Sequence, residues 1–263
     1  MIGVLVSKGD DKLFGALMLQ KDKDFKVYVP AGDLIAEAYD GKLSLAQGGL
    51  ADIQEPFVWI LEPGALPDKD FVRRVQRTIG RHPGFDVYHV NLVGAQPLPR
   101  IAKKEKLFRK LVQEHIPAPL SAFVFSTAAL REKAVFRADG SVNPLPTILS
   151  CAGEKGVRNV WRALLLWTAP VLAEDPASRD ARIQERLDFL RWTESFYADD
   201  YPLGVGDRLE LIAGELAKLY PSYSEDALKE MMQTFRAADG AVRKLRASSA
   251  LKSALKARQA QLQ

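Results

Sequence analysis

Residues 57–72 read FVWILEPGALPDKDFV, and this stretch decides the fold. Its first five residues are apolar without interruption, which is typical of a strand that is covered on both faces. Glu62, Pro63 and Gly64 then force a turn. In residues 71–79 the apolar side chains recur at helical spacing. A buried strand that leads through a turn into a helix predicts a βαβ unit and a largely parallel sheet.

The sequence on either side repeats this alternation of strand and helix. Residues 2–7 (IGVLVS) predict a first strand and residues 10–19 a helix. Residues 25–29 (FKVYV) predict a second strand, which closes on a Pro-Ala-Gly-Asp turn. Residues 34–50 predict only short helical pieces because glycines interrupt them, and residues 85–93 predict the next strand.

The pattern changes after residue 96, where prolines bracket a basic helix predicted for residues 102–114. Residues 122–126 (AFVFS) predict a strand, and Thr127 is the expected N-cap of the helix that follows. A further helix is predicted for residues 147–154. From residue 160 onward the sequence predicts helix almost throughout.

These elements divide the chain into an α/β domain, residues 1–160, and a helical C-terminal extension, residues 161–263. A length of 263 residues suffices for one large domain with such an extension. Hydrophobic residues make up 47% of the chain and charged residues 27%. This composition is ordinary for a globular protein and excludes a largely disordered chain.

Several features predict a cytoplasmic protein. The single cysteine, Cys151, excludes an intrachain disulfide and is expected to be a small core residue. Uncharged apolar runs such as residues 163–167 are far shorter than the roughly 20 residues that span a bilayer. The first residues, MIGVLVSKGDDK, have no basic segment followed by an apolar stretch and a cleavage site, so they read as a strand that begins at once.

The net charge of +4 is mild, but the basic residues are concentrated in residues 100–110 and 236–263. Such segments either attract phosphates, acidic membranes or nucleic acid, or are solvated helix faces. We expect Lys103, Lys104 and Lys106 to attract the protein to the inner face of a membrane, where it would be peripherally bound. Nucleic acid is not an expected partner, since the basic tail lacks interleaved aromatic residues and no known binding motif occurs.

Three stretches carry a resemblance to a known family: residues 57–72, residues 121–130 (SAFVFSTAAL) and residues 147–156 (TILSCAGEKG). In these, and in the order of elements over residues 2–161, the chain resembles the GT-A glycosyltransferases, most of all the inverting family 2. The resemblance implies a Rossmann-like mixed, mainly parallel sheet with helices on both faces. It also implies a nucleoside-diphosphate sugar donor, UDP-linked by preference, and a Mn²⁺ or Mg²⁺ ion.

The resemblance also implies the residues of a donor site. The family's Asp-x-Asp metal motif falls on Glu62-Pro63-Gly64 here, so Glu62 is the candidate metal ligand; hard cations take carboxylate oxygens. The literal Asp68-Lys69-Asp70 comes later, at a helix start, where acids are favoured by the helix dipole. Four candidate nucleotide contacts lie at the ends of the first two strands and a fifth lies in the buried strand: Ser7, Lys8, Gly32, Asp33 and Trp59.

The family's catalytic base is an acid just before the helix of residues 147–154. Residues 142–146 (VNPLP) contain no acid, and the nearest carboxylate upstream is Asp139. Asp139 is therefore either a substitute general base or a turn residue in Ala-Asp-Gly. Two hypotheses follow: a glycosyltransferase of hexosyltransferase type with an unknown acceptor, or a catalytically inactive binding or scaffold protein that retains nucleotide affinity.

Overall fold

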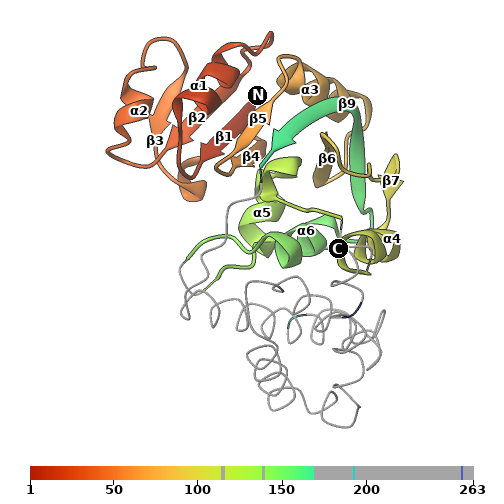
Figure 1. Cartoon of the computed structure of the whole chain (residues 1–263). Helices are drawn as coiled ribbons and strands as arrows, with labels where there is room; N and C mark the ends of the chain where they lie inside the picture. Colours follow the sequence, from red (N-terminus) through yellow and green to blue (C-terminus); the bar gives the residue numbers. More distant parts are fainter. Residues whose placement is uncertain (114–115, 138–139, 169–191, 193–255, 257–263) are drawn as a thin grey trace. The chain divides into compact units, whose positions relative to one another are not determined.

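The computed structural model describes residues 1–113, 116–137, 140–168, 192 and 256 (Figure 1). The chain divides into two compact units, Met1–Pro170 and Val171–Gln263. The second unit is described only at Trp192 and Lys256, both of which are helical. Most of the predicted helical extension therefore lies outside the described residues.

The first unit is built on one mixed sheet in which nine strands are described, in the order β3-β2-β1-β4-β8-β6-β9-β5, with β7 added beside β9 (Figure 1). The strands are β1 (Ile2–Val6), β2 (Phe25–Val29), β3 (Leu45–Gln47), β4 (Phe57–Leu61), β5 (Ala65–Pro67), β6 (Val87–Leu92), β7 (Ile101–Ala102), β8 (Phe123–Ser126) and β9 (Val157–Trp167).

Parallel pairings join β1 to β2 and β4, β2 to β3, and β6 to β9. Strand β8 lies between β4 and β6 and is antiparallel to both. Strands β6 and β9 therefore run in the same direction as β1 and β4. The prediction of a mixed, mainly parallel sheet is confirmed.

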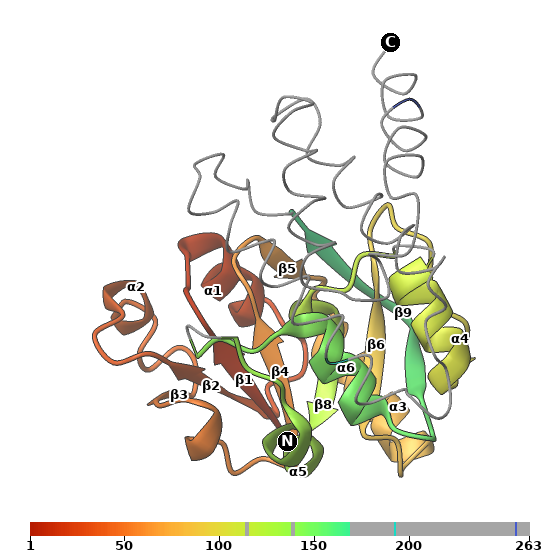
Figure 2. The same cartoon turned by 90° about the horizontal axis from the view of Figure 1, so that it is seen from below.

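Helices pack on both faces of the sheet, with α1 and α3 on one face and α4, α5 and α6 on the other (Figures 1 and 2). Their bounds are α1 (Asp11–Met18), α2 (Leu34–Glu37), α3 (Phe71–Arg81), α4 (Lys104–Phe108), α5 (Thr127–Lys133) and α6 (Pro144–Ala152). Single 3-10 turns occur at Leu50–Asp52 and Leu120–Ala122, and a π-helical turn at Arg109–Gln113 follows α4.

The core forms where α3 meets the centre of the sheet. The Trp59 ring of β4 stacks on Phe71 of α3 with ring centroids 3.9 Å apart and planes 12° from parallel. Neither side chain is exposed to solvent. Cys151 of α6 is also fully buried, as predicted, and burial raises the pKa of its thiol to about 12.

The prediction of helix from residue 160 onward is wrong for residues 160–167, which belong to β9. Val160, Ala163, Leu164 and Trp167 have the spacing of a helix face, but β6 presents an edge with which this segment pairs. The register shifts at Val90, so that Val160 lies opposite Val90 whereas Leu164 lies opposite Asn91. The extra residues include Arg162, whose φ of 74° is unusual for a residue with a side chain.

Smaller differences concern short elements. Residues 34–50 contain strand β3 as well as the short helix α2, and the predicted helix of residues 102–114 begins two residues later, after β7. The N-cap of α5 is Ser126, not Thr127: the Ser126 side chain accepts from the main-chain N–H of Ala129 at 3.4 Å. The Thr127 hydroxyl donates to the carbonyl of Glu55 at 2.6 Å.

Candidate functional site

The carboxyl ends of β1, β2 and β4 lie side by side at one edge of the sheet. Val6 lies opposite Leu61, and Leu5 lies opposite Tyr28. The main-chain N–H and the hydroxyl of Ser7 both donate to the carbonyl of Leu61, at 3.3 and 3.2 Å. Ser7 therefore lies beside Glu62, the residue that follows β4. Such an edge is where open α/β sheets bind ligands.

The turn after β2 supplies the second part of this edge. Gly32 has a φ of 79°, and a Cβ at this position would meet nothing within 4 Å, so the backbone is open to a ligand. Asp33 Oδ1 accepts from the main-chain N–H groups of Ile35 and Ala36, both at 3.1 Å, and thus caps α2. Asp33 also lines a hollow of about 260 Å³ between the carboxyl ends of β2 and β3 and the helix α2.

Glu62 is half-buried and is fixed by Ser121, a fully buried residue before β8. Its Oε2 accepts from the main-chain N–H of Ser121 at 3.2 Å and from the Ser121 hydroxyl at 3.4 Å. Burial raises the pKa of the Glu62 carboxyl, while hydrogen bonds from Ser121 and Leu120 and the charge of Arg137 oppose this rise. Ser121 was not predicted as a site residue, because a serine at the start of an apolar strand carries no motif.

The residues at this edge fit a divalent cation only together with a diphosphate. Within the described part of the chain, no group of three or more His, Cys, Asp or Glu residues could hold a metal ion. Glu62 is the candidate carboxylate next to Ser7, and its Oε2 already accepts two hydrogen bonds. Mg²⁺ in nucleotide sites takes one or two carboxylates, with phosphate oxygens and water completing the shell.

Asp68 and Asp70, the literal Asp-x-Asp pair, are engaged with cations. Asp68 Oδ2 lies 2.9 Å from Arg74, and Asp70 lies within 3.5 Å of Lys21, Arg73 and Arg74. Asp70 occupies the N-cap position of α3 but makes no side-chain cap hydrogen bond; Asp68 Oδ1 instead accepts from the Asp70 N–H at 2.7 Å. Both acids therefore stabilise the start of α3 through ion pairs and one hydrogen bond. This role is close to the predicted one, in which acids are favoured at the start of a helix.

Trp59, the candidate from the buried strand, does not add to the edge. Trp59 is a core residue: its side chain is fully buried, its Nε1 donates to the carbonyl of Ser121 at 2.7 Å, and one ring face is covered by Phe71. A ligand at the edge cannot reach it without disrupting this packing. Asp139 lies outside the described residues. Lys8 follows Ser7 and is exposed, so its ammonium group is free to approach an anion at the edge.

Solved structures with this architecture are known. TarS of S. aureus, as a fragment of residues 1–349 in complex with UDP-GlcNAc, matches 98% of this chain and 91% of its own, with 13% identity and a TM-score of 0.53. The same fragment with UDP matches 100% and 92%, with 17% identity and a TM-score of 0.50. No protein-family model matches the sequence, and no curated protein matches it.

Glucosyl-3-phosphoglycerate synthase of Mycobacterium tuberculosis, in complex with Mn²⁺, UDP and phosphoglyceric acid, covers 74% of this chain and 78% of its own. Its 12% identity and TM-score of 0.47 are too low to support an inference about this chain.

The element order, the sheet and the TarS comparison together show that the chain has a GT-A-like glycosyltransferase fold. At these identities the likeness concerns the fold alone. Among the described residues, no helix combines the length and apolar character that crossing a membrane requires.

Proposed function

We propose that this protein is a glycosyltransferase that binds a UDP-linked sugar at the edge formed by Ser7, Lys8, Gly32, Asp33 and Glu62. The observation that supports the proposal is the pair of hydrogen bonds from Ser7 to the Leu61 carbonyl, because it holds Ser7 and the end of β1 next to Glu62, the candidate metal ligand. The likeness in fold to TarS, whose structure is solved with UDP bound, supports a uridine nucleotide as the ligand class.

Each part of the edge has a chemical role in this proposal. The open backbone at Gly32 and the hollow beside Asp33 receive the base and ribose. The Lys8 ammonium group contacts the diphosphate, and the two Ser7 donors, which both bond to the Leu61 carbonyl, hold the end of β1 next to Glu62. Glu62, held in one orientation by Ser121, supplies one carboxylate oxygen to Mn²⁺ or Mg²⁺. When bound, such an ion neutralises charge on the diphosphate leaving group.

The acceptor hydroxyl needs a general base, and Asp139 is the candidate for that role. A positioned carboxylate contributes about 10²–10⁴-fold to the rate. If Asp139 is the base, Asp139→Asn abolishes donor turnover and leaves UDP affinity unchanged. Release of UDP from UDP-sugars, measured for the natural protein and this variant, tests the role directly.

The second candidate function is a GT-A-like binding or scaffold protein without turnover. It is favoured by one observation: the Glu62 carboxylate is bonded to Ser121, and burial raises its pKa, which disfavours the charged form that a metal requires. A calorimetric titration with uridine and guanosine diphosphates, with and without Mn²⁺, separates the two. Binding that is indifferent to Mn²⁺, with no UDP release, supports the scaffold.

We also propose that the basic segment around Lys103 and Lys106 attracts an anionic membrane surface. Both residues are exposed. Each such cation contributes about 1 kcal/mol near an anionic surface. Sedimentation with anionic vesicles at low salt tests this proposal, and failure to sediment rejects it.

A further inference from the structure

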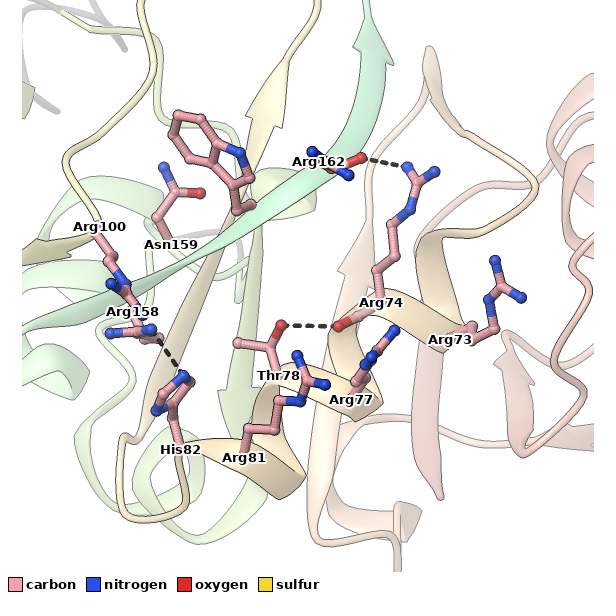
Figure 3. A pocket seen from close by; sticks show the side chains of 11 residues that line it. Arg73, Arg74, Arg77, Thr78, Arg81, His82, Arg100, Arg158, Asn159 and Arg162 are labelled. Atoms are coloured by element: carbon pink, nitrogen blue, oxygen red, sulfur yellow. Dashed lines mark hydrogen bonds between the residues drawn. The ribbon is translucent and has the colours of Figure 1, made fainter.

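A second hollow, of about 830 Å³, lies between α3 and β9, and seven of the eleven residues that line it are arginines (Figure 3). We call it the arginine groove. Its residues come from three segments: 73–82 in and just after α3, Arg100 before β7, and 158–162 in β9. None of the residues of the proposed donor site lines it.

The sequence creates this groove through two ordinary rules of packing. Helix α3 buries Phe71, Val72 and Val75, which leaves Arg73, Arg77 and Arg81 as a stripe with a spacing of four along its outer side. Strand β7 pairs with β9 so that Ile101 lies opposite Arg158, and the N–H of Asn159 donates to the carbonyl of Arg100 at 3.1 Å. Arginines far apart in sequence thereby face one hollow.

Most of this positive charge is not compensated. Arg73 and Arg74 pair with Asp70 and Asp68, at 2.7 and 2.9 Å. The other five arginines have no carboxylate within salt-bridge distance among the residues that the structure describes: Arg77, Arg81, Arg100, Arg158 and Arg162. Five guanidinium groups around one hollow repel each other unless an anion joins them.

The buried Arg158 also lacks a hydrogen-bond acceptor for part of its guanidinium group. Its side chain is only 6% exposed, its Nη2 lies 2.8 Å from Nε2 of His82, and its buried Nε has no hydrogen-bond partner (Figure 3). A buried charge without an acceptor is costly unless a ligand supplies one. Burial, together with the charges of Arg158, Arg100 and Arg81, lowers the pKa of His82. The described part of the groove thus holds more hydrogen-bond donors than acceptors, although the buried Asn159 Oδ1 also lacks a partner.

We propose that the arginine groove binds a small ligand that carries two or more phosphate groups. Guanidinium groups match phosphate oxygens with paired hydrogen bonds, and several separate arginines match several phosphates. The hollow is large enough for such a molecule. Arg158 lies opposite Tyr88, near the amino end of β6, whereas the donor edge lies at the carboxyl ends of strands that run in the same direction. The groove is therefore a second site.

The test is calorimetric titration of the full chain with inorganic phosphate, pyrophosphate and tripolyphosphate. We expect affinity to rise about tenfold with each added phosphate, as charge-assisted hydrogen bonds accumulate. The exposed pair Arg77→Gln and Arg81→Gln should weaken tripolyphosphate binding at least about tenfold. The matched control is Lys23→Gln with Lys42→Gln, two exposed lysines outside the groove and outside the proposed donor and membrane surfaces, whose loss changes the net charge equally and leaves binding within about twofold.

Two further arms complete the test. Tripolyphosphate binding that stays within about twofold in Lys8→Gln supports a second site, whereas binding that is lost in Lys8→Gln and kept in the groove variant places the anion at the donor edge and overturns the proposal. Equal weakening by the groove and control variants also overturns it, since charge alone then explains binding. If a short single-stranded oligonucleotide binds far more tightly than tripolyphosphate, the groove is a nucleic-acid site and the proposal of a small ligand is overturned. The increase in UDP affinity on adding Mn²⁺ is expected to stay unchanged in the Arg77, Arg81 variant, which keeps this test separate from that of the donor site.

Discussion

Glu62 and Ser121 hold each other by hydrogen bonds in both directions: the N–H of Glu62 donates to Ser121 Oγ at 2.8 Å, and the N–H of Ser121 donates to Glu62 Oε2 at 3.2 Å. The pair joins the carboxyl end of β4 to the segment that leads into β8. The orientation of Glu62 is therefore set before any ligand binds. Its carboxylate is partly buried, which disfavours the charged form.

The first prediction concerns stability and pH. Because burial raises the pKa of Glu62 in the folded protein, folding favours the protonated form, and this contribution is lost as the pH rises through the folded pKa. Glu62→Gln removes the ionisable group and keeps an oxygen acceptor for Ser121. We expect the variant to gain stability relative to the natural protein between acidic and neutral pH, in urea unfolding at a series of pH values. A constant difference across the series would contradict the raised pKa.

The second prediction concerns the coupling of metal and nucleotide. If one carboxylate and the diphosphate share an ion, each ligand tightens the other by the same factor, typically about 5–150-fold. Glu62→Gln should remove most of this factor. Titration of UDP with and without Mn²⁺ measures it, and Glu105→Gln, an exposed acid on α4, is the control. Full coupling in Glu62→Gln would exclude Glu62 as the ligand.

The third prediction separates two roles of Asp33. Its carboxylate caps α2, so Asp33→Ala should lower stability by about 1 kcal/mol, whereas Asp33→Asn keeps a side-chain oxygen that can cap. If Asp33 also contacts the nucleotide through its charge, both variants weaken UDP binding. UDP affinity that falls only in Asp33→Ala would indicate that the cap alone matters.

The fourth prediction concerns the core. Trp59→Ala removes a fully buried ring stacked on Phe71 and should destabilise the protein by about 3–5 kcal/mol. Trp161, which is 65% exposed, is the matched control, and Trp161→Ala should change stability by less than about 0.5 kcal/mol. Urea unfolding measures both. Equal effects would contradict the placement of Trp59.

The fifth prediction concerns His82. Burial and the nearby arginines lower its pKa, so the folded protein takes up this proton at a lower pH than the unfolded chain, and stability decreases as the pH falls through the ordinary histidine range. Arg100→Gln, at an exposed position, should raise the His82 pKa, and bound tripolyphosphate should raise it as well. Titration followed by NMR of the imidazole signals measures both shifts, and an unchanged pKa in each case would contradict the electrostatic account.

Strands with strong local signals were predictable from the sequence. The run of residues 57–61 is apolar throughout and lies at the centre of the sheet, so local composition and final burial agree. Strands β3 and β5 have three residues each and take their conformation from β2 and β9, which no local pattern reveals. In β9 the helical spacing of apolar residues misled the prediction, because pairing with β6 prevails over local periodicity.

The candidate site was predictable where it depends on strand ends. Ser7 and Glu62 each follow an apolar run, and parallel strands bring such residues to one edge; their roles in binding stay a prediction. Ser121 and the arginine groove were not predictable, since both depend on which distant segments become neighbours. Arg81 and Arg158 belong to no motif in the sequence and Arg100 only begins the basic segment of residues 100–110, and only the register of β7 on β9 and the packing of α3 gather them.

The late position of β9 in the chain also governs the order in which the unit can assemble during synthesis. Strands β1 and β2 have their described partners within the first 61 residues, whereas β4 pairs with β1 there and with β8 only later. In the described sheet, β5 and β7 pair only with β9. One edge of β6 also stays unpaired until β9 is present, since Val87 pairs with Val157 there. A nascent chain that has not yet released residues 157–167 from the ribosome therefore exposes open strand edges, which are the surfaces that aggregate. Contacts of such long sequence separation also form slowly.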